Sequence, residues 1–582
     1  MTDVEFDFDQ VVIGSGFGGS VSALRLSEKG YRVLVLEKGL RREDEDFPEL
    51  NWDVKNYIWE PKLGLKGATQ FSFTSKVALI HGVGVGGGSQ VYANVHLIPT
   101  DAAFESPAWS RIHSDWKQRL SPFYALAQRM LGTTKNVSFN IADETLKAVA
   151  EDIGRGDSFA AVNTGVVFPD AGQVKGASVP DPYFSGDGPE RNSCQDCGSC
   201  TIGCRNNAKN TLMKNYLYFA ERNGVEIRAE SEVVRIEALA NDSGVKDGSA
   251  GYQLTVQNST RRFSKEPYTI RTRGVVVSAG VMGTVPLLLK MRDQAKTLPN
   301  ISTWLGQQVR TNSETLITAN NLNAEVWKAP TITSMISSDD HTTVEINRFG
   351  KGSDAAWFYM PFVPMVSGES RFRRLKMLAN LIMHPLKTFK VLNPVGKARN
   401  SIIFLVMQTR EAYIHLEWHR KWYRLFSKGI SAAQKPEDEP LGVSFPSAEL
   451  VARTYAEKMQ GEPGTSVGEI MLGTPITAHM MSGVAIGTNS DNGVVDEGGE
   501  VFGYQNLRVL DGSIIPGNLG VNPSLTITAL SEYAMSKLPV FDQQRAGKIK
   551  PIHFSIAKPG QVSSIKGGGN LLADIIADQL GT

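Results

Sequence analysis

Short apolar runs separated by glycine turns mark the beginning of the chain. Residues 9–13 are apolar enough for a buried strand, and a glycine-rich turn follows at 14–19. Over 20–30, apolar residues recur at the spacing of one helical face and end at a lysine followed by glycine, a usual helix stop. A second apolar run, 31–36, has the length of a buried parallel strand. Together these segments predict a strand–helix–strand unit.

Two later runs repeat this pattern far along the chain. The β-branched run 274–280 is followed by a helix-like stretch at 285–292, and the run 507–510 is followed by a predicted helix over about 525–537. Between them, 342–346 alternates polar and apolar residues as a half-buried strand does. The chain therefore reads as α/β (α+β overall): one doubly wound domain has pieces at the beginning, middle and end, and a second domain is inserted between them.

These patterns give approximate domain limits. We expect the first domain to comprise 1–110, 185–300 and 470–545, the second to comprise 111–184 and 301–469, and a C-terminal tail to cover 546–582. The polar, proline-bearing segment 428–446 predicts an exposed loop, and the tail predicts a short amphipathic helix.

Composition and charge exclude some functions. With 582 residues the chain is long enough for two domains, and a formal net charge of +1 gives no electrostatic case for binding nucleic acid. No apolar run approaches the ~18 residues of a membrane span. The acidic start lacks the basic and apolar regions of a secretion signal, so we expect a cytoplasmic protein.

The first glycine turn has the spacing of a dinucleotide-binding fingerprint. Gly14 permits the tight turn, Gly16 lets the backbone beside Ser15 approach a pyrophosphate, and Gly19 allows close packing of helix and strand. Glu37, eighteen residues after Gly19, is placed to accept hydrogen bonds from ribose hydroxyls. The fingerprint does not distinguish FAD from NAD.

A second glycine cluster lies at 81–89 and is followed by 90–94. Backbone with so few side chains can wrap a large planar cofactor, although a second phosphate loop is the alternative. The residues that we expect to contact the cofactor here are Gly84, Gly86, Gly87, Gly88, Ser89 and Asn94.

At this point the chain resembles a known family. The stretches GSGFGGSVSALRLSEKGYRVLVLEKG, GVGVGGGSQVYAN and LRVLDGSIIPGNLGVNPSLTITALSE are similar to those of the glucose–methanol–choline (GMC) oxidoreductases, and among them to the bacterial cholesterol-oxidase-like branch. The resemblance implies FAD, a Rossmann-like FAD-binding domain and a substrate domain built on an antiparallel sheet. It further implies flavin or adenine contacts at Val233, Asp511, Gly512, Pro523 and Ser524.

The resemblance also implies a catalytic pair, His479 and Asn522. Hydride removal from an alcohol requires a group that accepts the hydroxyl proton, and the imidazole of His479 suits this at neutral pH. Asn522 can orient the oxygen without titrating. The pair implies oxidation of a secondary alcohol, the 3-hydroxyl of a sterol, to a ketone. Because Met-Met-Ser-Gly follows His479 where sterol oxidases carry Pro-Leu-Gly-Gly, another hydrophobic or sugar alcohol, or a non-catalytic electron-transfer protein, remains an alternative.

Some sterol oxidases also use a glutamate to shift a double bond. Glu314 and Glu411 are possible counterparts, but no motif anchors either, and neither is assigned such a role.

All four cysteines of the chain lie within eleven residues, at Cys194, Cys197, Cys200 and Cys204. Their spacing is that of the bacterial ferredoxin run, which favours an iron–sulfur cluster of three or four irons. Structural zinc and reduced cysteines without metal are the alternatives. A cluster would pass the electrons from the flavin to a carrier protein instead of directly to oxygen.

Residues 371–390 combine arginines and lysines with leucines and an isoleucine in the pattern of a basic amphipathic helix. Such a helix can lie on an anionic membrane surface, which would place the protein at the inner face of a membrane. The alternative is a helix packed on the domain with a solvated basic face.

Overall fold

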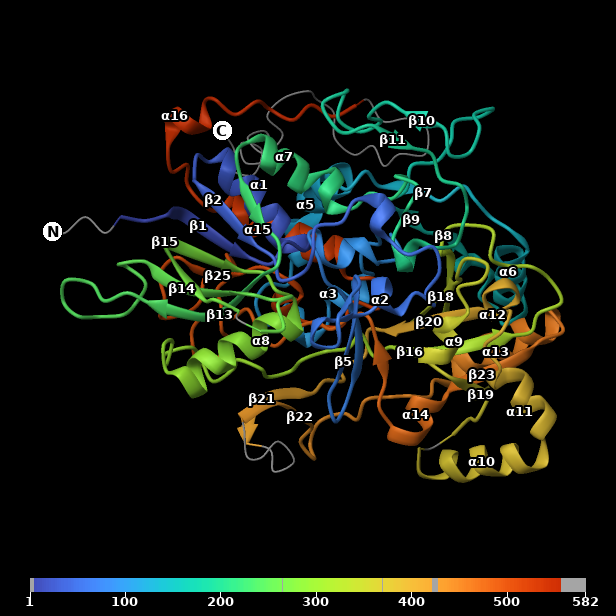
Figure 1. Cartoon of the computed structure of the whole chain (residues 1–582). Helices are drawn as coiled ribbons and strands as arrows, with labels where there is room; N and C mark the ends of the chain where they lie inside the picture. The colour runs from blue at the N-terminus through green and yellow to red at the C-terminus, as the bar shows by residue number, and fades with distance from the viewer. Residues whose placement is uncertain (1–4, 264, 369, 421–427, 556–582) are drawn as a thin grey trace.

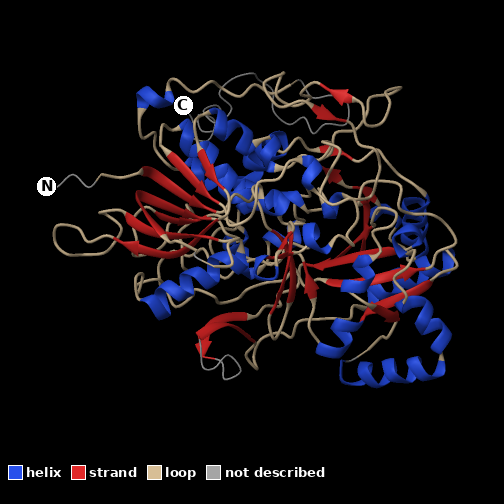
Figure 2. Ribbon diagram, in the orientation of Figure 1, coloured by secondary structure: helices blue, strands red, loops and turns tan. Residues whose placement is uncertain are grey.

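The computed structural model describes residues 5–263, 265–368, 370–420 and 428–555. Two seven-stranded sheets lie at opposite sides of the molecule, with a smaller sheet between them (Figures 1 and 2). The first sheet has the order β12-β2-β1-β15-β14-β13, and β25 lies beside β15. Its strands are β1 (Phe8–Ile13), β2 (Val33–Leu36), β12 (Glu226–Arg228), β13 (Ser231–Ala238), β14 (Tyr252–Asn258), β15 (Tyr268–Val277) and β25 (Leu507–Val509).

The parallel part of this sheet is built from distant pieces of the chain. β1 pairs in parallel with both β2 and β15, and β15 pairs in parallel with β25. These central strands are almost entirely buried, as expected for a sheet covered on both faces. β13 and β14 continue the sheet as antiparallel strands.

Helices on one face tie the ends of the chain together. α1 (Phe17–Glu28) packs between α15 (Ser524–Ser536) and α7 (Tyr216–Arg222), and α15 packs on α5 (Trp116–Met130). Arg25 of α1 forms a buried ion pair with Glu532 of α15, and the Tyr216 hydroxyl donates to the same carboxylate. Because a buried charge is costly unless paired, this cluster fixes how the three helices meet.

The second sheet is antiparallel throughout, in the order β19-β23-β16-β20-β18-β17-β8. Its strands are β8 (Ala160–Ala161), β16 (Thr315–Asn320), β17 (Ile332–Asp339), β18 (Thr342–Asn347), β19 (Phe362–Pro364), β20 (Ile402–Gln408) and β23 (Glu462–Ser466). Alternate residues of β20 face opposite sides. Ile402, Phe404 and Val406 join the core under α6 (Ile141–Asp152) and α13 (Pro446–Lys458), while Ile403 and Leu405 face the interior of the molecule.

A small sheet joins the two halves. β6 (Ala78–Gly82) pairs with β5 (Thr69–Phe73) on one side and with β24 (Ile476–Thr477) on the other. β6 leads directly into the second glycine cluster, and β24 leads into His479. This pairing therefore brings His479 beside the glycine-rich backbone, although almost 400 residues separate them in sequence.

The predicted fold class is confirmed: the protein is a mixed α/β structure with a Rossmann-like domain and an inserted antiparallel sheet. The prediction of a loop over 428–446 is wrong for residues 428–433. These residues form β22 (Lys428–Ala433), which pairs with β21 (His415–Arg420) and buries Ala432.

The segment 371–390 is not one helix. α10 (Ser370–Met383) ends before His384, and α11 (Pro385–Leu392) begins at a proline, whose ring disfavours a continuous helix. The helix predicted for the C-terminal tail falls largely outside the described residues. Within the described part of the chain, no helix is long and apolar enough to cross a membrane.

Candidate active site

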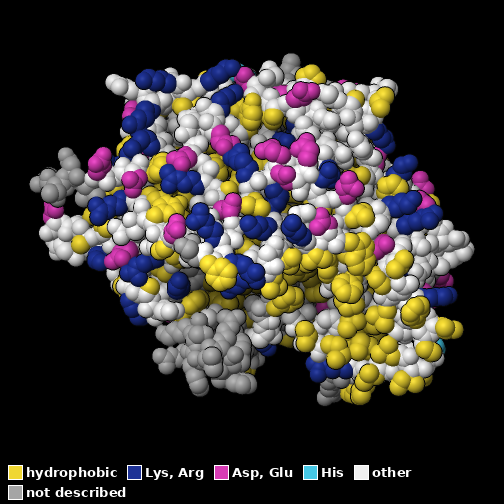
Figure 3. Space-filling model, viewed as in Figure 1, with side chains coloured by type: hydrophobic (Ala, Val, Ile, Leu, Met, Phe, Trp, Pro, Cys, Tyr) yellow, Lys and Arg dark blue, Asp and Glu magenta, His cyan; other side chains and the backbone are white. Residues whose placement is uncertain are grey.

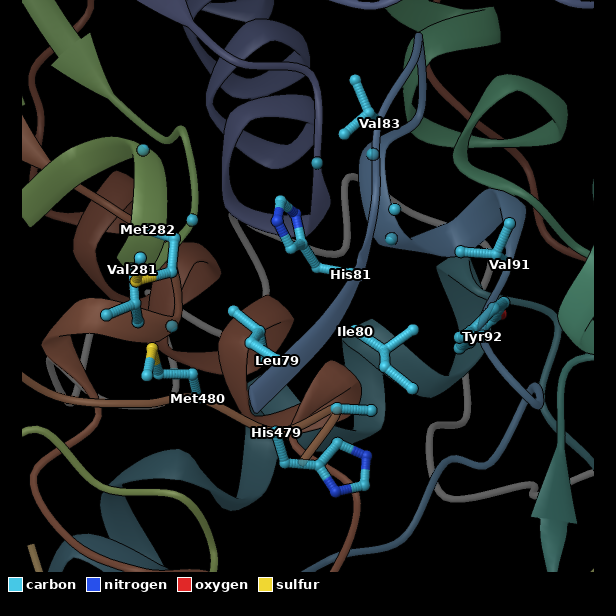
Figure 4. Close-up of a pocket in the computed structure, with 18 of the residues that line it drawn as sticks. Leu79, Ile80, His81, Val83, Val91, Tyr92, Val281, Met282, His479 and Met480 are labelled. Carbon is cyan, nitrogen blue, oxygen red and sulfur yellow. The ribbon is translucent and has the colours of Figure 1, made fainter. Parts of the chain in front are cut away.

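A cavity of about 600 Å³ lies between the two large sheets. The glycine turn after β1 lines one end, and Leu316, Ile403 and Leu405 of the second sheet line the other. Figure 4 shows β6 crossing this cavity, with His479 alongside its Leu79–Ile80 stretch and His81 further along the same strand. The first end is lined by glycine backbone, which suits a dinucleotide, and the second is lined by apolar side chains, which suit a hydrophobic substrate.

The dinucleotide end is built around Glu37, the residue that directly follows β2. Its carboxylate accepts hydrogen bonds from the Ser15 amide (3.1 Å), the Ser15 hydroxyl (2.8 Å) and the Gly39 amide (2.8 Å). A Cβ on Gly19 would lie 2.0 Å from the Gly14 carbonyl oxygen, so only glycine allows helix α1 to approach the turn this closely.

Gly16 differs from Gly19, because a Cβ on Gly16 would meet no protein atom within 4 Å. Its backbone has an ordinary negative φ of −71°. Neither packing nor strain in the protein therefore explains the glycine at this position, and the space in front of it fits the close approach of a pyrophosphate at the N-terminus of α1.

The two glycine clusters touch each other. A Cβ on Gly87 would lie 2.6 Å from the Gly16 Cα. Ser89 contributes by holding the loop: its hydroxyl donates to the Gly86 carbonyl (2.7 Å) and accepts from the Leu212 amide (3.0 Å). Asn94 is buried, and neither polar atom of its side chain has a hydrogen-bond partner in the described part of the protein.

The structure brings most of the predicted site residues to the wall of the cavity. These are Gly14, Ser15, Gly16, Glu37, Gly87, Gly88, Val233, His479, Asp511, Gly512, Asn522, Pro523 and Ser524. Gly19, Gly84, Gly86, Ser89 and Asn94 lie behind the wall, where they shape the two loops.

Glu314 lies beside His479 and also lines the cavity. His479 Nδ1 is 3.3 Å from Glu314 Oε2, and that oxygen also accepts from the Ala478 amide at 3.0 Å. The ring of His479 lines the cavity, so Nε2, on the side of the ring away from Glu314, can face a substrate. Burial alone would lower the pKa of His479, but the Glu314 and Glu345 carboxylates offset this and raise the pKa above its ordinary value.

A second glutamate lies behind Asn522. The Asn522 Nδ2 amide donates to Glu345 Oε2 at 3.2 Å, and both residues are buried. Asn522 Oδ1 and Glu345 Oε1 have no hydrogen-bond partner within the described structure. Asn522 lines the cavity, and buried polar atoms are rarely left unsatisfied, so its Oδ1 marks a place where a ligand's hydroxyl can bind.

Asp511 is placed by β25 at the carboxyl edge of the first sheet. Its Oδ2 accepts from the Gly280 amide (2.9 Å) and the Thr284 hydroxyl (2.5 Å) at the start of α8 (Val281–Leu289). Burial raises the pKa of Asp511, and these hydrogen bonds partly oppose the shift. The residue thus holds the loop after β15 against the cavity wall.

The sequence signals neither Glu345 nor the contact of Glu314 with His479, because both depend on tertiary structure. His81 also lines the cavity, but burial lowers its pKa to about 3 and its Nε2 pairs with the Ser72 hydroxyl, so it remains neutral.

The buried Glu345 gives a prediction about stability. Burial raises its pKa to about 7, against about 4.3 in an unfolded chain. The folded state then binds a proton that the unfolded chain releases, so stability falls as pH rises between these two values. Glu345→Gln should therefore gain stability relative to the wild type as pH rises from 5 to 8, by up to about 3 kcal/mol.

Thermal unfolding midpoints across this pH range measure the effect, with the exposed Glu105→Gln as the matched control. A difference between Glu345→Gln and wild type that does not change with pH would contradict the ionisation assigned to this site.

Comparisons with known proteins agree with this geometry. Two family models described as GMC oxidoreductase match residues 187–291 and 437–531, and a model of an NAD(P)-binding Rossmann-like domain matches 12–41. A cholesterol oxidase from Acinetobacter baumannii is 42% identical over 97% of this chain and 100% of its own length. A cholesterol oxidase from Mycobacterium tuberculosis is 39% identical over 92% of this chain and 91% of its own.

Among solved structures, pyridoxine 4-oxidase from Mesorbium loti shares the fold, with a TM-score of 0.54 and 14% identity over 91% of this chain and 99% of its own. The fold, the glycine-lined cavity and these relatives together define a FAD-dependent alcohol oxidoreductase. The chain belongs to the GMC oxidoreductase family.

Proposed function

We propose that this protein oxidises the 3-hydroxyl of a sterol, or of a similarly hydrophobic secondary alcohol, to a ketone. The observation that carries the proposal is the apolar end of the cavity, which runs from His479 and Asn522 toward Leu316, Ile403 and Leu405. An apolar wall of this kind suits a ring system that carries only one polar group. The names of the two cholesterol oxidases point to the same substrate class.

In the proposed mechanism the alcohol oxygen lies between His479 and Asn522. The hydroxyl proton moves to His479 while the carbinol hydrogen leaves as hydride, so that the carbonyl forms as both are removed. Bound FAD supplies the hydride acceptor. Glu314 keeps Nδ1 of His479 turned away from the substrate and stabilises the imidazolium that forms.

Asn522 orients the substrate oxygen, and Glu345 in turn holds the Asn522 amide through Nδ2. This arrangement leaves Asn522 Oδ1 free to accept a hydrogen bond from the substrate hydroxyl. His479 and Asn522 are thus catalytic residues in the proposal, and Glu314 and Glu345 are positioning residues.

The cofactor contacts form part of the same proposal. Gly14, Ser15 and Gly16 would approach the pyrophosphate, and Glu37 would accept from the ribose. Val233 would contact the adenine. The backbone at Pro523 and Ser524 begins α15, whose N-terminal dipole can stabilise negative charge on the reduced ring.

The domain division stays as the sequence predicts it in this proposal. FAD binds to 1–110, 185–300 and 470–545, and substrate binds to 111–184 and 301–469. The strands of the first sheet lie in the first set of residues and those of the antiparallel sheet lie in the second, which supports the division for the strands. The helix α5, from 111–184, instead packs on α15 of the first domain.

Substrate preference tests the proposal. Purified enzyme should show a kcat/KM for 3-hydroxysterols at least about a hundredfold above that for glucose or choline. A sterol can contact the apolar side chains that line the cavity, whereas glucose and choline cannot. A preference for sugars would overturn the assignment of the substrate class.

We also propose that the enzyme works in the cytoplasm against the inner face of a membrane. α10 and α11 expose apolar side chains beside basic ones, and Figure 3 shows the apolar patch at the lower right, where Figure 1 places these helices. The apolar members are Leu375, Leu378, Ile382, Met383, Leu386 and Phe389, and the exposed basic members are Arg374, Lys376, Lys387 and Lys390. This combination suits an anionic lipid surface.

Binding to vesicles measures this contact. Ile382 and Leu386 are each 79% exposed, so replacing both by serine should leave the fold intact and weaken binding to anionic vesicles about tenfold or more. Val174→Ser, at a site that is 76% exposed elsewhere, is the matched control. Equal binding by both variants would contradict the membrane assignment.

A further inference from the structure

Asn347 is a polar residue on the apolar wall of the cavity. It ends β18, where it lies opposite Ile403 of β20 and Ile332 of β17. Residues that oppose each other in an antiparallel sheet point to the same face, and Ile403 and Ile332 both line the cavity. Asn347 lines it as well, and so does Phe349, two residues further on. A carboxamide therefore stands among apolar side chains at this end of the cavity.

Within the described part of the chain, the carboxamide oxygen of Asn347 is unpartnered. Its Oδ1 is buried and accepts no hydrogen bond there. The backbone of β18 is already paired on both sides, because this strand lies between β17 and β20. A polar group in an apolar wall is costly unless it is hydrogen-bonded, so neither packing nor strand pairing explains the asparagine. A hydrogen bond from a ligand would explain it.

A second unpartnered group comes from the loop 194–204, which carries the cysteines. The Thr201 hydroxyl is buried without a partner among the described residues, and Thr201 lines the cavity. All four cysteines lie in the described part of the chain, and no group of three or more His, Cys, Asp or Glu there could hold a metal ion. The expectation of an iron–sulfur cluster or zinc therefore gains no support from the structure, whereas Thr201 gives the loop a place at the cavity.

Two hydrogen bonds fasten this loop beside Asn347. The Cys200 amide donates to the Thr331 hydroxyl at 3.1 Å, and that hydroxyl donates to the Gly198 carbonyl at 3.1 Å. Thr331 directly precedes Ile332, the residue that lies opposite Asn347. The unpartnered hydroxyl of the loop and the carboxamide of β18 therefore belong to one corner of the cavity.

The spacing along β18 relates this corner to the reacting centre. Glu345, which holds the Asn522 amide, comes two residues before Asn347. It lies on the same face of the sheet, since it pairs with Leu405, which lines the cavity. Two residues of a strand span about 7 Å. A fused ring system whose hydroxyl is held at Asn522 is long enough to reach Asn347.

Together the two side chains select a hydroxyl group. Oδ1 of Asn347 can only accept a hydrogen bond, whereas the Thr201 hydroxyl can donate one. A ligand hydroxyl can donate to the first and accept from the second at the same time. A ketone or ether oxygen can only accept, so it would leave Asn347 unsatisfied.

We propose that Asn347 and Thr201 form a second polar subsite, which binds a hydroxyl group on the ring system of the substrate, away from the carbon that is oxidised. The inference rests on the proposed alcohol oxidation and narrows its substrate class to 3-hydroxysteroids with a second ring hydroxyl. Both residues determine specificity in this proposal, and neither touches the reacting atoms.

Kinetics with paired substrates test the subsite. Each pair consists of a 3-hydroxysteroid and the same steroid with one more hydroxyl, placed on ring B, C or D. For the best-placed hydroxyl, kcat/KM should be about tenfold or more above that of the parent alcohol, because the buried carboxamide gains its partner. A wild type that fails to prefer the hydroxylated member of any pair would overturn the proposal.

Variants assign the preference to the two residues. Asn347→Leu, which removes the carboxamide and keeps a similar volume, should bring the ratio of the two kcat/KM values down to about one. Thr201→Val removes only a hydroxyl and should lower the ratio by about threefold or more, which decides the matter if Asn347→Leu fails to fold. Asn300→Leu, at an exposed asparagine outside the cavity wall, should keep the ratio of the wild type.

The ratio distinguishes a binding role from a structural one. A structural defect would lower kcat/KM for both alcohols together and leave their ratio unchanged. A wild-type ratio in Asn347→Leu, or in Thr201→Val when only that variant folds, would contradict the assignment.

Binding of unreactive ligands separates this inference from the alcohol oxidation. The corresponding 3-ketones, with and without the ring hydroxyl, are titrated into the FAD-loaded enzyme by calorimetry. The hydroxylated ketone should bind about tenfold or more tightly than its parent in the wild type, and no more tightly in Asn347→Leu. If no alcohol reduces the flavin, the proposed oxidation is wrong and the ketones still decide whether the subsite exists. Equal affinities, or no binding of either ketone, would overturn it.

Discussion

Replacing His479 by alanine should slow the anaerobic reduction of the flavin by sterol by about 10²–10⁴-fold, the usual contribution of a positioned acid–base group. The imidazole is the titratable group that faces the cavity with a buried carboxylate behind it, and Asn522 cannot accept the proton in its place. The flavin spectrum and FAD content should be unchanged, because the dinucleotide end of the cavity is built by other residues. Stopped-flow absorbance under anaerobic conditions measures the rate.

The matched control is His113→Ala, which removes an imidazole that pairs with Glu497 outside the cavity. It should reduce its flavin at the rate of the wild type. If His479→Ala also did so, the proton acceptor would be another group and the proposed mechanism would be wrong.

Replacing Gly16 by valine should strongly weaken FAD binding while the protein still folds. The new side chain would meet no protein atom at its Cβ, and φ at this position suits any residue, so the fold has no reason to fail. The side chain would instead occupy the space that the pyrophosphate needs, and we expect the FAD content to fall by about tenfold or more. Flavin absorbance per chain and far-ultraviolet circular dichroism measure the two outcomes.

Gly468→Ala is the control for this experiment. A Cβ there has ordinary contacts of 3.6 and 3.8 Å, and the residue lies in α14 (Val467–Leu472), outside the cavity wall. This variant should keep its FAD. A yellow Gly16→Val protein with a full complement of FAD would show that the cofactor does not approach the first glycine turn.

Features that depend on neighbouring residues could be predicted from the sequence. The strand, glycine turn and helix of β1 and α1 depend on local spacing, and so does the apolar run of β15. The β21–β22 hairpin could not be predicted in this way, because β22 has only a short apolar face, Ile430 and Ala432, and pairing with β21 completes the strand.

The electrostatics of the site could not be predicted in the same way. Glu345 contacts Asn522 across 177 residues, and Glu314 contacts Ala478 across 164 residues. In each case a glutamate in or beside a strand of the antiparallel sheet meets a segment from much later in the chain. No motif near either glutamate signals the contact. The family resemblance points to the residues that would touch the substrate, whereas the structure adds the carboxylates that would orient them.

The central claim is that the glycine-lined cavity holds one FAD next to His479 and Asn522. Anaerobic titration of the purified protein with a 3-hydroxysterol tests it most directly. The account predicts a yellow protein with one FAD per chain, whose absorbance is bleached by one equivalent of sterol as one equivalent of ketone forms. A colourless protein that cannot be reconstituted with FAD would contradict it.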